Sequence, residues 1–455
     1  MKSKKIISFV LATILMVFGI PQFATEAEAA TTNYVRAIAQ YATIYNVTDY
    51  GVDTTGKSDC GADISSLVKS LVKARTDESV PIVIYMPSGK YKLTSPIKLS
   101  STRSLSYNNI HLIAEKDTVV SAGKKMRSLV EIQKNSNVSL LGGKWDGCNK
   151  TTYNIKIYNA TDITVSECSI TRAREKGIHI SGSTANVDKI KAYKNGVYGV
   201  SLGSNANVTM KNSKVYSNGK YGVVVGSSIL HMENGNNKIY KNKSTGVSVS
   251  NSSAELYASG NSFTKNGSKG NGHGIGIAAG AYGEITNNVI ENNNQCGISV
   301  FSKAKAVVTN NSIKNNGRHG IGAAEGITLT AENNTITGNK WHGIMVRDKG
   351  TGTITNNVLS KNSVAGLCVE KSSATVDGNT MYKNKSNGIY AVAAKISMSN
   401  NKITKNKAFG IYTSDRSKVK VVSGNVIKSN SKGDIDGSGS KVTIGKGNTV
   451  KKVIS

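Results

Sequence analysis

The sequence Gly297-Ile298-Ser299-Val300 begins a unit that recurs along most of the chain. The same start, a Gly followed by an aliphatic residue, returns at intervals of 22 to 28 residues at Gly177, Gly199, Gly222, Gly246, Gly274, Gly297, Gly320, Gly343, Gly366, Gly388 and Gly410. A fixed period in this range is typical of a solenoid. After the Gly, apolar and variable residues alternate, which indicates a half-buried β-strand. The repeat therefore predicts a stack of short strands.

Two columns of Asn share this period and indicate how the units stack. One column consists of Asn288, Asn311, Asn334, Asn357, Asn379, Asn401 and Asn425, and the other of Asn293, Asn316, Asn339, Asn362, Asn384 and Asn406. Asn tolerates the left-handed conformation of a sharp turn, and stacked copies can pass amide hydrogen bonds from coil to coil. A leucine-rich repeat has a similar length, but its Leu-rich consensus is absent. We predict an all-β, right-handed parallel β-helix of about 13 coils between Val130 and Val421.

The amino-terminal segment predicts export from the cell. Lys2, Lys4 and Lys5 precede an apolar run over 6–20, and Ala27-Glu28-Ala29-Ala30 supplies an Ala-x-Ala exit. This pattern indicates a secretory signal peptide over 1–30. The alternative is a retained membrane anchor, for which the apolar run is short. We expect a secreted protein, extracellular or associated with the cell surface, with no membrane span in its mature form.

The charge of the chain predicts an anionic partner. The formal net charge is +30, and a positive field of this size concentrates polyanions near the surface. Candidate partners are uronic-acid polysaccharides, sulfated glycans, anionic wall polymers and nucleic acid. We do not expect nucleic acid, because the sequence carries no helix-turn-helix, zinc-finger or RNA-binding strand motif.

Residues 31–110 differ from the repeats and predict a cap. Asp63 begins an amphipathic pattern that places Ile64, Leu67, Val68 and Leu71 on one stripe, typical of about three helical turns. A strand over 81–87 follows. A helix across the first coil covers unpaired strand edges and apolar side chains. We therefore divide the mature chain into this cap region, β-helix repeats over 111–432 and a closing segment over 433–455.

Several motifs of the cap resemble a known family. The series Val47-Thr48-Asp49-Tyr50-Gly51-Val52, Gly56-Lys57-Ser58-Asp59 and Tyr85-Met86-Pro87-Ser88-Gly89-Lys90-Tyr91 looks like the amino-terminal cap of the pectate-lyase-like superfamily of secreted β-helix proteins. Gly142-Gly143-Lys144-Trp145-Asp146-Gly147 is similar to the first-coil element of polygalacturonases. With the coils, the resemblance covers nearly all of the mature chain and implies its fold. It selects no activity, because the superfamily includes lyases, hydrolases, epimerases, tailspikes and binding proteins.

The first candidate site consists of outward positions on consecutive coils, which stacking brings within about 5 Å of one another. One column holds Glu131, Lys156, His179 and Ser201, the next holds Gln133, Tyr158, Ser181 and Gly203, and Arg172, Arg174, Glu175 and Lys176 approach from the preceding turn. Such a group could neutralise a uronate carboxylate and remove the neighbouring proton. We assign catalysis to Glu131, Lys156, His179 and Tyr158, with Lys156 or His179 as base and Tyr158 as acid. The alternative is a solvated ion ladder from Glu131 to Lys156.

Arg172 and Arg174 are predicted to clamp the substrate carboxylate. A second column, just before the repeated Gly, adds further candidates for substrate contact, namely Lys176, Tyr198, Tyr221, His319 and His342, with Arg318 and Trp341 one position earlier. Aromatic rings and hydrogen-bonding groups suit the faces and hydroxyls of sugars. The alternative is that these side chains cover turns without any ligand.

Two further patterns concern metal binding and hydrolysis. Carboxylates of Glu325, Asp348, Glu370 and Asp415 fall at similar offsets on several coils, so Ca²⁺ is a possible cofactor. Salt bridges to Arg347 and Lys371 explain them equally well, and we assign no metal ligand. Gly272-His273-Gly274-Ile275 is similar to the polygalacturonase Gly-His-Gly, but the chain has no Asp between Lys189 and Gly272. Glycoside hydrolysis uses paired carboxylates, so hydrolysis is disfavoured.

Lysines also precede Asn of the turn columns, at Lys194, Lys241, Lys265, Lys361, Lys383 and Lys405. They form either a solvated edge or a surface for polyanions. Together these patterns predict a secreted protein that acts on or binds an acidic polysaccharide, with β-elimination by a polysaccharide lyase as the leading reaction. The alternatives are a uronan C5-epimerase, which begins with the same proton loss, and a non-catalytic basic surface protein that binds polyanionic glycans.

Overall fold

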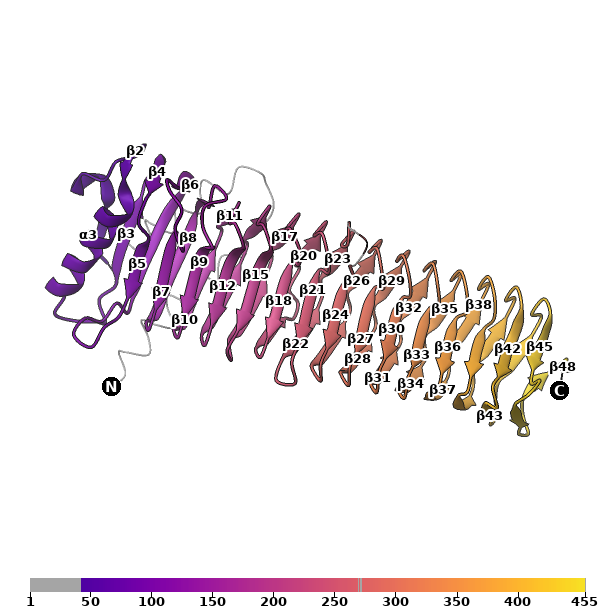
Figure 1. Ribbon diagram of the computed structural model, residues 1–455. Coiled ribbons are helices and arrows are strands. Elements are labelled where there is room, and N and C mark those ends of the chain that lie inside the picture. Colours follow the sequence, from indigo (N-terminus) through magenta and orange to yellow (C-terminus); the bar gives the residue numbers. More distant parts are fainter. Residues whose placement is uncertain (1–41, 269, 271, 455) are drawn as a thin grey trace.

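The chain forms a straight rod of stacked coils, with its single described α-helix at the amino-terminal end (Figure 1). The computed structural model describes residues 42–268, 270 and 272–454. It has about 14 turns, close to the 13 coils predicted, and every strand pair is parallel. The predicted parallel β-helix is therefore confirmed. The predicted signal peptide lies outside the described residues.

Each coil contributes to two sheets, which we call sheet A and sheet B. A representative coil consists of β27 (Ile298–Phe301), β28 (Lys305–Thr309) and β29 (Ser312–Lys314). The first strand belongs to the 16-stranded sheet B and the other two to the 32-stranded sheet A. Sheet B contains β5 (Ile97–Ser100), β7 (Val130–Gln133), β9 (Tyr153–Tyr158), β12 (Lys176–Ser181), β15 (Tyr198–Gly203), β18 (Val223–Gly226), β21 (Val247–Ser250), β24 (Ile275–Ala278), β27, β30 (Ile321–Ala324), β33 (Ile344–Arg347), β36 (Leu367–Glu370), β39 (Ile389–Val392), β42 (Phe409–Ser414), β45 (Gly433–Asp436) and β48 (Val453–Ile454).

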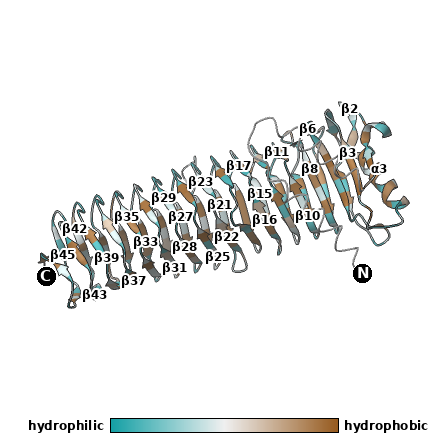
Figure 2. Cartoon of the chain, turned by 180° about the vertical axis from the view of Figure 1, so that it is seen from behind, coloured by the Kyte–Doolittle hydropathy of each residue, from teal (hydrophilic) through white to brown (hydrophobic). Residues whose placement is uncertain are grey.

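The core runs along the axis of the rod, between the two sheets. Ile298 and Val300 point inward with 0 % of their surface exposed, and Ile321 of the next coil pairs with Ile298. Apolar residues recur on the strands along the whole rod (Figure 2). Each fully buried aliphatic side chain contributes about 1.5–3 kcal/mol, so the alternating pattern of the repeat supplies the driving force for stacking.

The repeated Gly is required by close packing between coils. A Cβ at Gly297 would lie 2.7 Å from Cγ2 of Ile313 and 2.8 Å from the carbonyl oxygen of Gly320. No other residue type fits that space without displacing the next coil. The number of residues between successive copies of this Gly therefore equals the length of one coil.

Two Asn ladders run along the rod and extend beyond the predicted columns. The first ladder joins Asn237, Asn261, Asn288, Asn311, Asn334, Asn357, Asn379, Asn401, Asn425 and Asn448. The second joins Asn195, Asn218, Asn242, Asn266, Asn293, Asn316, Asn339, Asn362, Asn384, Asn406 and Asn430. In each step the side-chain amide donates to the Oδ1 of the next Asn, as predicted.

The conformation predicted for the ladder residues was wrong. The left-handed residue is the one before the ladder Asn, for example Asn315 (φ 54°) before Asn316 and Lys383 (φ 55°) before Asn384. The preceding residue makes the turn and points outward, which leaves the ladder Asn buried, with 0 % exposure for Asn316 and Asn384. An interior position allows the amide to satisfy backbone groups as well as its neighbour.

The cap is a four-turn helix that begins earlier than predicted. Helix α3 (Cys60–Ala74) starts after Asp59, not at Asp63, because the Asp59 carboxylate accepts a hydrogen bond from the Gly61 N–H at 3.0 Å. Its stripe of Cys60, Ile64, Leu67, Val68 and Val72 is buried against the first coils. β3 (Ile82–Met86) matches the strand predicted over 81–87, and β46 (Lys441–Ile444) lies in the closing segment.

Among residues 42–268, 270 and 272–454, no helix combines the length and apolar character needed to cross a membrane.

All five cysteines are free.

Candidate functional site

The first candidate column lies on the outer face of sheet B, on the coils of β7, β9, β12 and β15. Glu131 pairs with Lys156, Lys156 with His179 and His179 with Ser201, each on adjacent strands. The neighbouring column likewise aligns Gln133, Tyr158, Ser181 and Gly203. The structure therefore places the predicted side chains side by side.

The surroundings of His179 keep its imidazole neutral. Its ring stacks on the Tyr153 ring, with centroids 5.1 Å apart and 17° between the planes. Burial, followed by the positive charges of Lys176, Lys156 and Arg127, lowers the pKa of His179 to about 4. Nδ1 is buried without a hydrogen-bond partner among the described residues. The imidazole is thus neutral at pH 7, and its unpartnered Nδ1 is not exposed to solvent.

Glu131 and Lys156 do not form the ion ladder considered as an alternative. No ion pair joins them in the described part of the chain. Instead the Lys156 ammonium lies 5.5 Å from the centroid of the Tyr158 ring, and Glu131 accepts a hydrogen bond from the Ser128 hydroxyl at 2.7 Å. Tyr158 is 38 % exposed. Lys156 and Tyr158 are therefore available at the surface beside His179.

The two arginines predicted as clamps are already engaged by the protein. Arg172 follows β11 (Ser169–Thr171), and its Nε donates to Oδ1 of the buried Asp146 at 2.8 Å, while its Nη2 contacts Oδ2. Burial would raise the pKa of Asp146, but hydrogen bonds from Arg172 and the Cys148 N–H hold it below its usual range. Arg174 donates to Glu175 at 3.1 Å and to Thr152 at 3.2 Å. Arg172 therefore anchors a turn.

A line of aromatic rings and ammonium groups borders His179. Lys176 lies between two rings, with Nζ 5.4 Å from the centroid of Tyr153 and 6.0 Å from that of Tyr198. Tyr198 stacks on Tyr221 at 5.6 Å, and Lys220 lies over Tyr221. Sequence reasoning missed Tyr153, although it stands one coil before Lys176 at the same register position. Extending the column by one period would have found it.

The remaining predicted contacts form a separate cluster. His319 stacks on His342 at 5.4 Å and meets the edge of Trp341, whose ring also lies under Arg318 at 4.9 Å. Burial lowers the pKa of His319 to about 2 and that of His342 to about 4. This cluster precedes β30 and β33, six coils from β12, or about 30 Å at the spacing of stacked strands. It is not part of the His179 site.

The carboxylates considered for Ca²⁺ do not converge. Asp348 pairs with Arg347 at 3.2 Å, and Glu325 accepts a hydrogen bond from Ser302 at 2.6 Å. In the described ranges, no group of three or more His, Cys, Asp or Glu is arranged to hold a metal ion. These residues do not fit Ca²⁺, which takes six to eight oxygen ligands.

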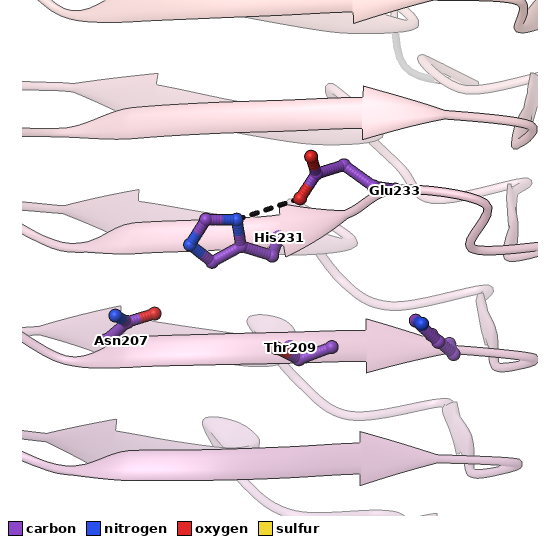
Figure 3. A pocket seen from close by; sticks show the side chains of 5 residues that line it. Asn207, Thr209, His231 and Glu233 are labelled. Carbon is purple, nitrogen blue, oxygen red and sulfur yellow. Dashed lines mark hydrogen bonds and ion pairs between the residues drawn. The ribbon is translucent and has the colours of Figure 1, made fainter.

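A polar hollow on sheet A, with a volume of about 400 Å³, is the alternative location for chemistry. β16 (Asn207–Lys211) lines it together with His231 and Glu233, from β19 (Ile229–Met232) and just after it. Figure 3 shows the His231 imidazole turned toward the Glu233 carboxylate, with the bonded atoms 2.9 Å apart. The Glu233 carboxylate thus bonds Nδ1 of His231, whereas His179 lies beside the cationic side chains of Lys156 and Lys176. We therefore take the sheet B column that contains His179 as the candidate functional site.

Comparison with models of protein families agrees with this architecture. The model described as "Right handed beta helix region" matches residues 107–263, 233–375 and 324–453, and "Rhamnogalacturonase A/epimerase, pectate lyase-like" matches 44–113. The search of curated proteins finds no match.

Three similar solved structures come from different organisms. The mannuronan C-5 epimerase AlgE4 A-module of Azotobacter vinelandii is 16 % identical, with a TM-score of 0.44, and the match covers 90 % of this chain and 100 % of that one. PfbA, a surface adhesin of Streptococcus pneumoniae, is 15 % identical over 68 % and 89 % of the two chains, with a TM-score of 0.45. The α-1,3-glucanase catalytic unit of Streptomyces thermodiastaticus is 14 % identical over 91 % and 70 %, with a TM-score of 0.35. From the family matches, which span most of its length, the chain belongs to the right-handed β-helix proteins of the pectate-lyase-like superfamily.

Proposed function

We propose that this protein binds an acidic polysaccharide across sheet B and cleaves it by β-elimination beside a uronate carboxylate. The observation that carries the proposal is His179, a neutral imidazole between the cationic side chains of Lys156 and Lys176. A base next to two cations suits removal of a proton from the carbon that bears a carboxylate, because the cations stabilise the negative charge that develops.

The proposed reaction uses four side chains. Lys156 and Lys176 neutralise the uronate carboxylate, and His179 accepts the proton from C5. The electron pair of the C5–H bond forms the C4–C5 double bond, and the C4–O4 bond breaks. Tyr158 donates its proton to the departing O4. Of the two bases predicted, His179 is preferred because its imidazole is unprotonated at pH 7, which leaves Lys156 as the cation.

The experiment is incubation with polygalacturonate, alginate and glycosaminoglycans, read by ultraviolet absorbance of the unsaturated product. His179→Gln should lower kcat by at least about 100-fold, the usual contribution of a general base, and Lys156→Ala should raise KM and lower kcat. His231→Gln is the matched control. It alters a histidine on the outer face of sheet A, away from the sheet B site, and should keep full activity. A fully active His179→Gln enzyme would exclude the proposed base.

A non-catalytic polyanion-binding protein is the second candidate. The net charge of +30 favours this candidate, because a positive surface attracts polyanions whether or not a reaction follows. Retention on an anionic glycan without product from any substrate would identify such a binder. Exchange of the substrate C5 proton with solvent deuterium without chain cleavage would identify an epimerase instead.

A further inference from the structure

We propose that a groove on sheet A, near the carboxyl end of the rod, is a second binding site for an anionic polysaccharide. The groove has a volume of about 490 Å³. We call it the lysine groove, and its polar lining consists of Thr351, Thr353, Ser373, Thr375, Lys395, Ser397, Lys418, Lys420, Lys441 and Thr443. These residues come from β34 (Thr351–Thr355), β37 (Ser373–Asp377), β40 (Lys395–Ser399), β43 (Lys418–Val421) and β46.

Register stacks the lysines on consecutive coils. Lys395 pairs with Lys418, and Lys418 pairs with Lys441, while Lys420 stands between Ser397 and Thr443 in the next column. Adjacent strands are about 4.8 Å apart, so four ammonium groups repel one another across a small area. Like charges directly opposite in a sheet destabilise the free protein. The arrangement is therefore costly to the fold itself.

The protein does not neutralise this charge. Among the described residues, no carboxylate lies within salt-bridge distance of these four lysines. Asp377 is the one acidic residue on the five strands, and it stands at a strand end, where it accepts a hydrogen bond from the Asn400 amide at 3.0 Å. The unpaired cations thus require a partner with regularly spaced negative groups.

The rest of the lining indicates the class of that partner. Hydroxyls of Thr351, Thr353, Ser373 and Thr375 continue the lysine columns toward the amino-terminal end. Hydroxyls donate and accept hydrogen bonds as sugar hydroxyls do. No aromatic side chain lines the groove, whereas single-stranded nucleic acid is usually bound by stacking of bases on aromatic rings. An extended glycan with an anionic group on each sugar fits best.

The lysine groove is independent of the His179 site. It lies on sheet A over β34 to β46, whereas His179 lies on sheet B on β12. Loss of binding in the groove therefore leaves turnover of short oligosaccharides at His179 unchanged, and an inactive His179 variant still binds in the groove.

The test is a variant with Lys395, Lys418, Lys420 and Lys441 all changed to Gln. Its control changes Lys57, Lys69, Lys73 and Lys116, four exposed lysines near the amino-terminal end of the rod, to Gln, which removes the same charge elsewhere. Affinity for polygalacturonate, heparin and a single-stranded oligothymidylate is measured by calorimetry at several salt concentrations. We expect the groove variant to bind at least one glycan 10-fold or more weakly, with a shallower salt dependence, and the control to change less than 3-fold.

The glycan arms separate carboxylate from sulfate recognition. Equal losses in the groove and control variants would overturn the proposal, because net charge alone would then explain binding. Tighter binding of the oligothymidylate than of both glycans, lost in the groove variant, would also overturn it. If the fourfold variant does not fold, Lys418→Gln with Lys420→Gln provides the same comparison against Lys69→Gln with Lys73→Gln.

Discussion

At the scale of single residues, the most unusual feature is a set of lysines in the left-handed conformation. Lys194, Lys241, Lys265, Lys361, Lys383 and Lys405 have φ between 54° and 57°. The left-handed region costs an ordinary residue about 1–2 kcal/mol. Asn315 and Gly338 hold the same position in other coils, so the turn does not require Lys. The column of lysines was predicted from the sequence, but its left-handed backbone conformation was not. That conformation was expected at the ladder Asn, whereas the residue before it makes the turn.

Replacing one of these lysines should stabilise the rod. Lys383→Gly removes the left-handed strain, and after the entropic cost of Gly we expect a net gain of about 0.5–1 kcal/mol. The measurement is the midpoint of urea unfolding. Lys385→Gly is the control, since Lys385 is exposed and not left-handed, and it should be neutral or destabilising. A loss of stability in Lys383→Gly would show that the side chain itself stabilises this turn.

At the scale of elements, the Asn ladders connect each coil to the next through the interior. The Oδ1 of Asn339 accepts hydrogen bonds from both the Nδ2 and the backbone N–H of Asn316, each at 3.0 Å. Asn316 also donates to the Ile290 carbonyl at 3.2 Å. One side chain thus satisfies polar groups of several coils that have no access to water.

Asn339→Ala should therefore be severely destabilising. It leaves two buried donors of Asn316 without an acceptor, at about 1–3 kcal/mol each, so we expect a loss of about 2–5 kcal/mol. Asn294→Ala, on an exposed turn residue two coils before Asn339, should change stability by less than about 0.5 kcal/mol. The comparison is made by urea unfolding of both variants. Equal effects would mean that the ladder contributes little.

Local patterns explain why some features could be predicted and others could not. The Gly register and the alternation after it fixed the coils, and they correctly aligned Glu131, Lys156 and His179. The engagement of Arg172 by Asp146 was not predictable, since it depends on how a turn packs against a residue 26 positions earlier. The same holds for the Tyr153–His179 stack, which depends on side-chain rotamers that no periodicity specifies.

At the scale of the whole molecule, histidines that are wholly or partly buried make stability depend on pH. Burial lowers the pKa of five histidines along the rod, namely His111, His179, His273, His319 and His342. Above the ordinary value of 6.5 they are neutral both folded and unfolded. Below it the unfolded chain binds protons that the folded chain excludes, so the free energy of unfolding decreases as pH falls from 6.5 toward 4.

Removing one such histidine should weaken this dependence. Each contributes a slope of up to about 1.4 kcal/mol per pH unit. We expect His319→Gln to show a shallower loss of stability between pH 6.5 and pH 4, measured by urea unfolding across that range. Asn294→Ala, which alters an exposed residue that does not titrate, is the control and should retain the wild-type slope. An unchanged slope in His319→Gln would contradict the proposed burial of a neutral imidazole.

The ladders also bear on how such a protein can change its length. Because each ladder Asn bonds groups of its own coil and of the two neighbouring coils, removal of a complete coil, such as 311–333, brings equivalent partners together again. Duplication of a coil preserves the pattern in the same way. The distance between the His179 column and the lysine groove can therefore vary in whole-coil steps during evolution, while the bonding pattern within each remaining layer is conserved.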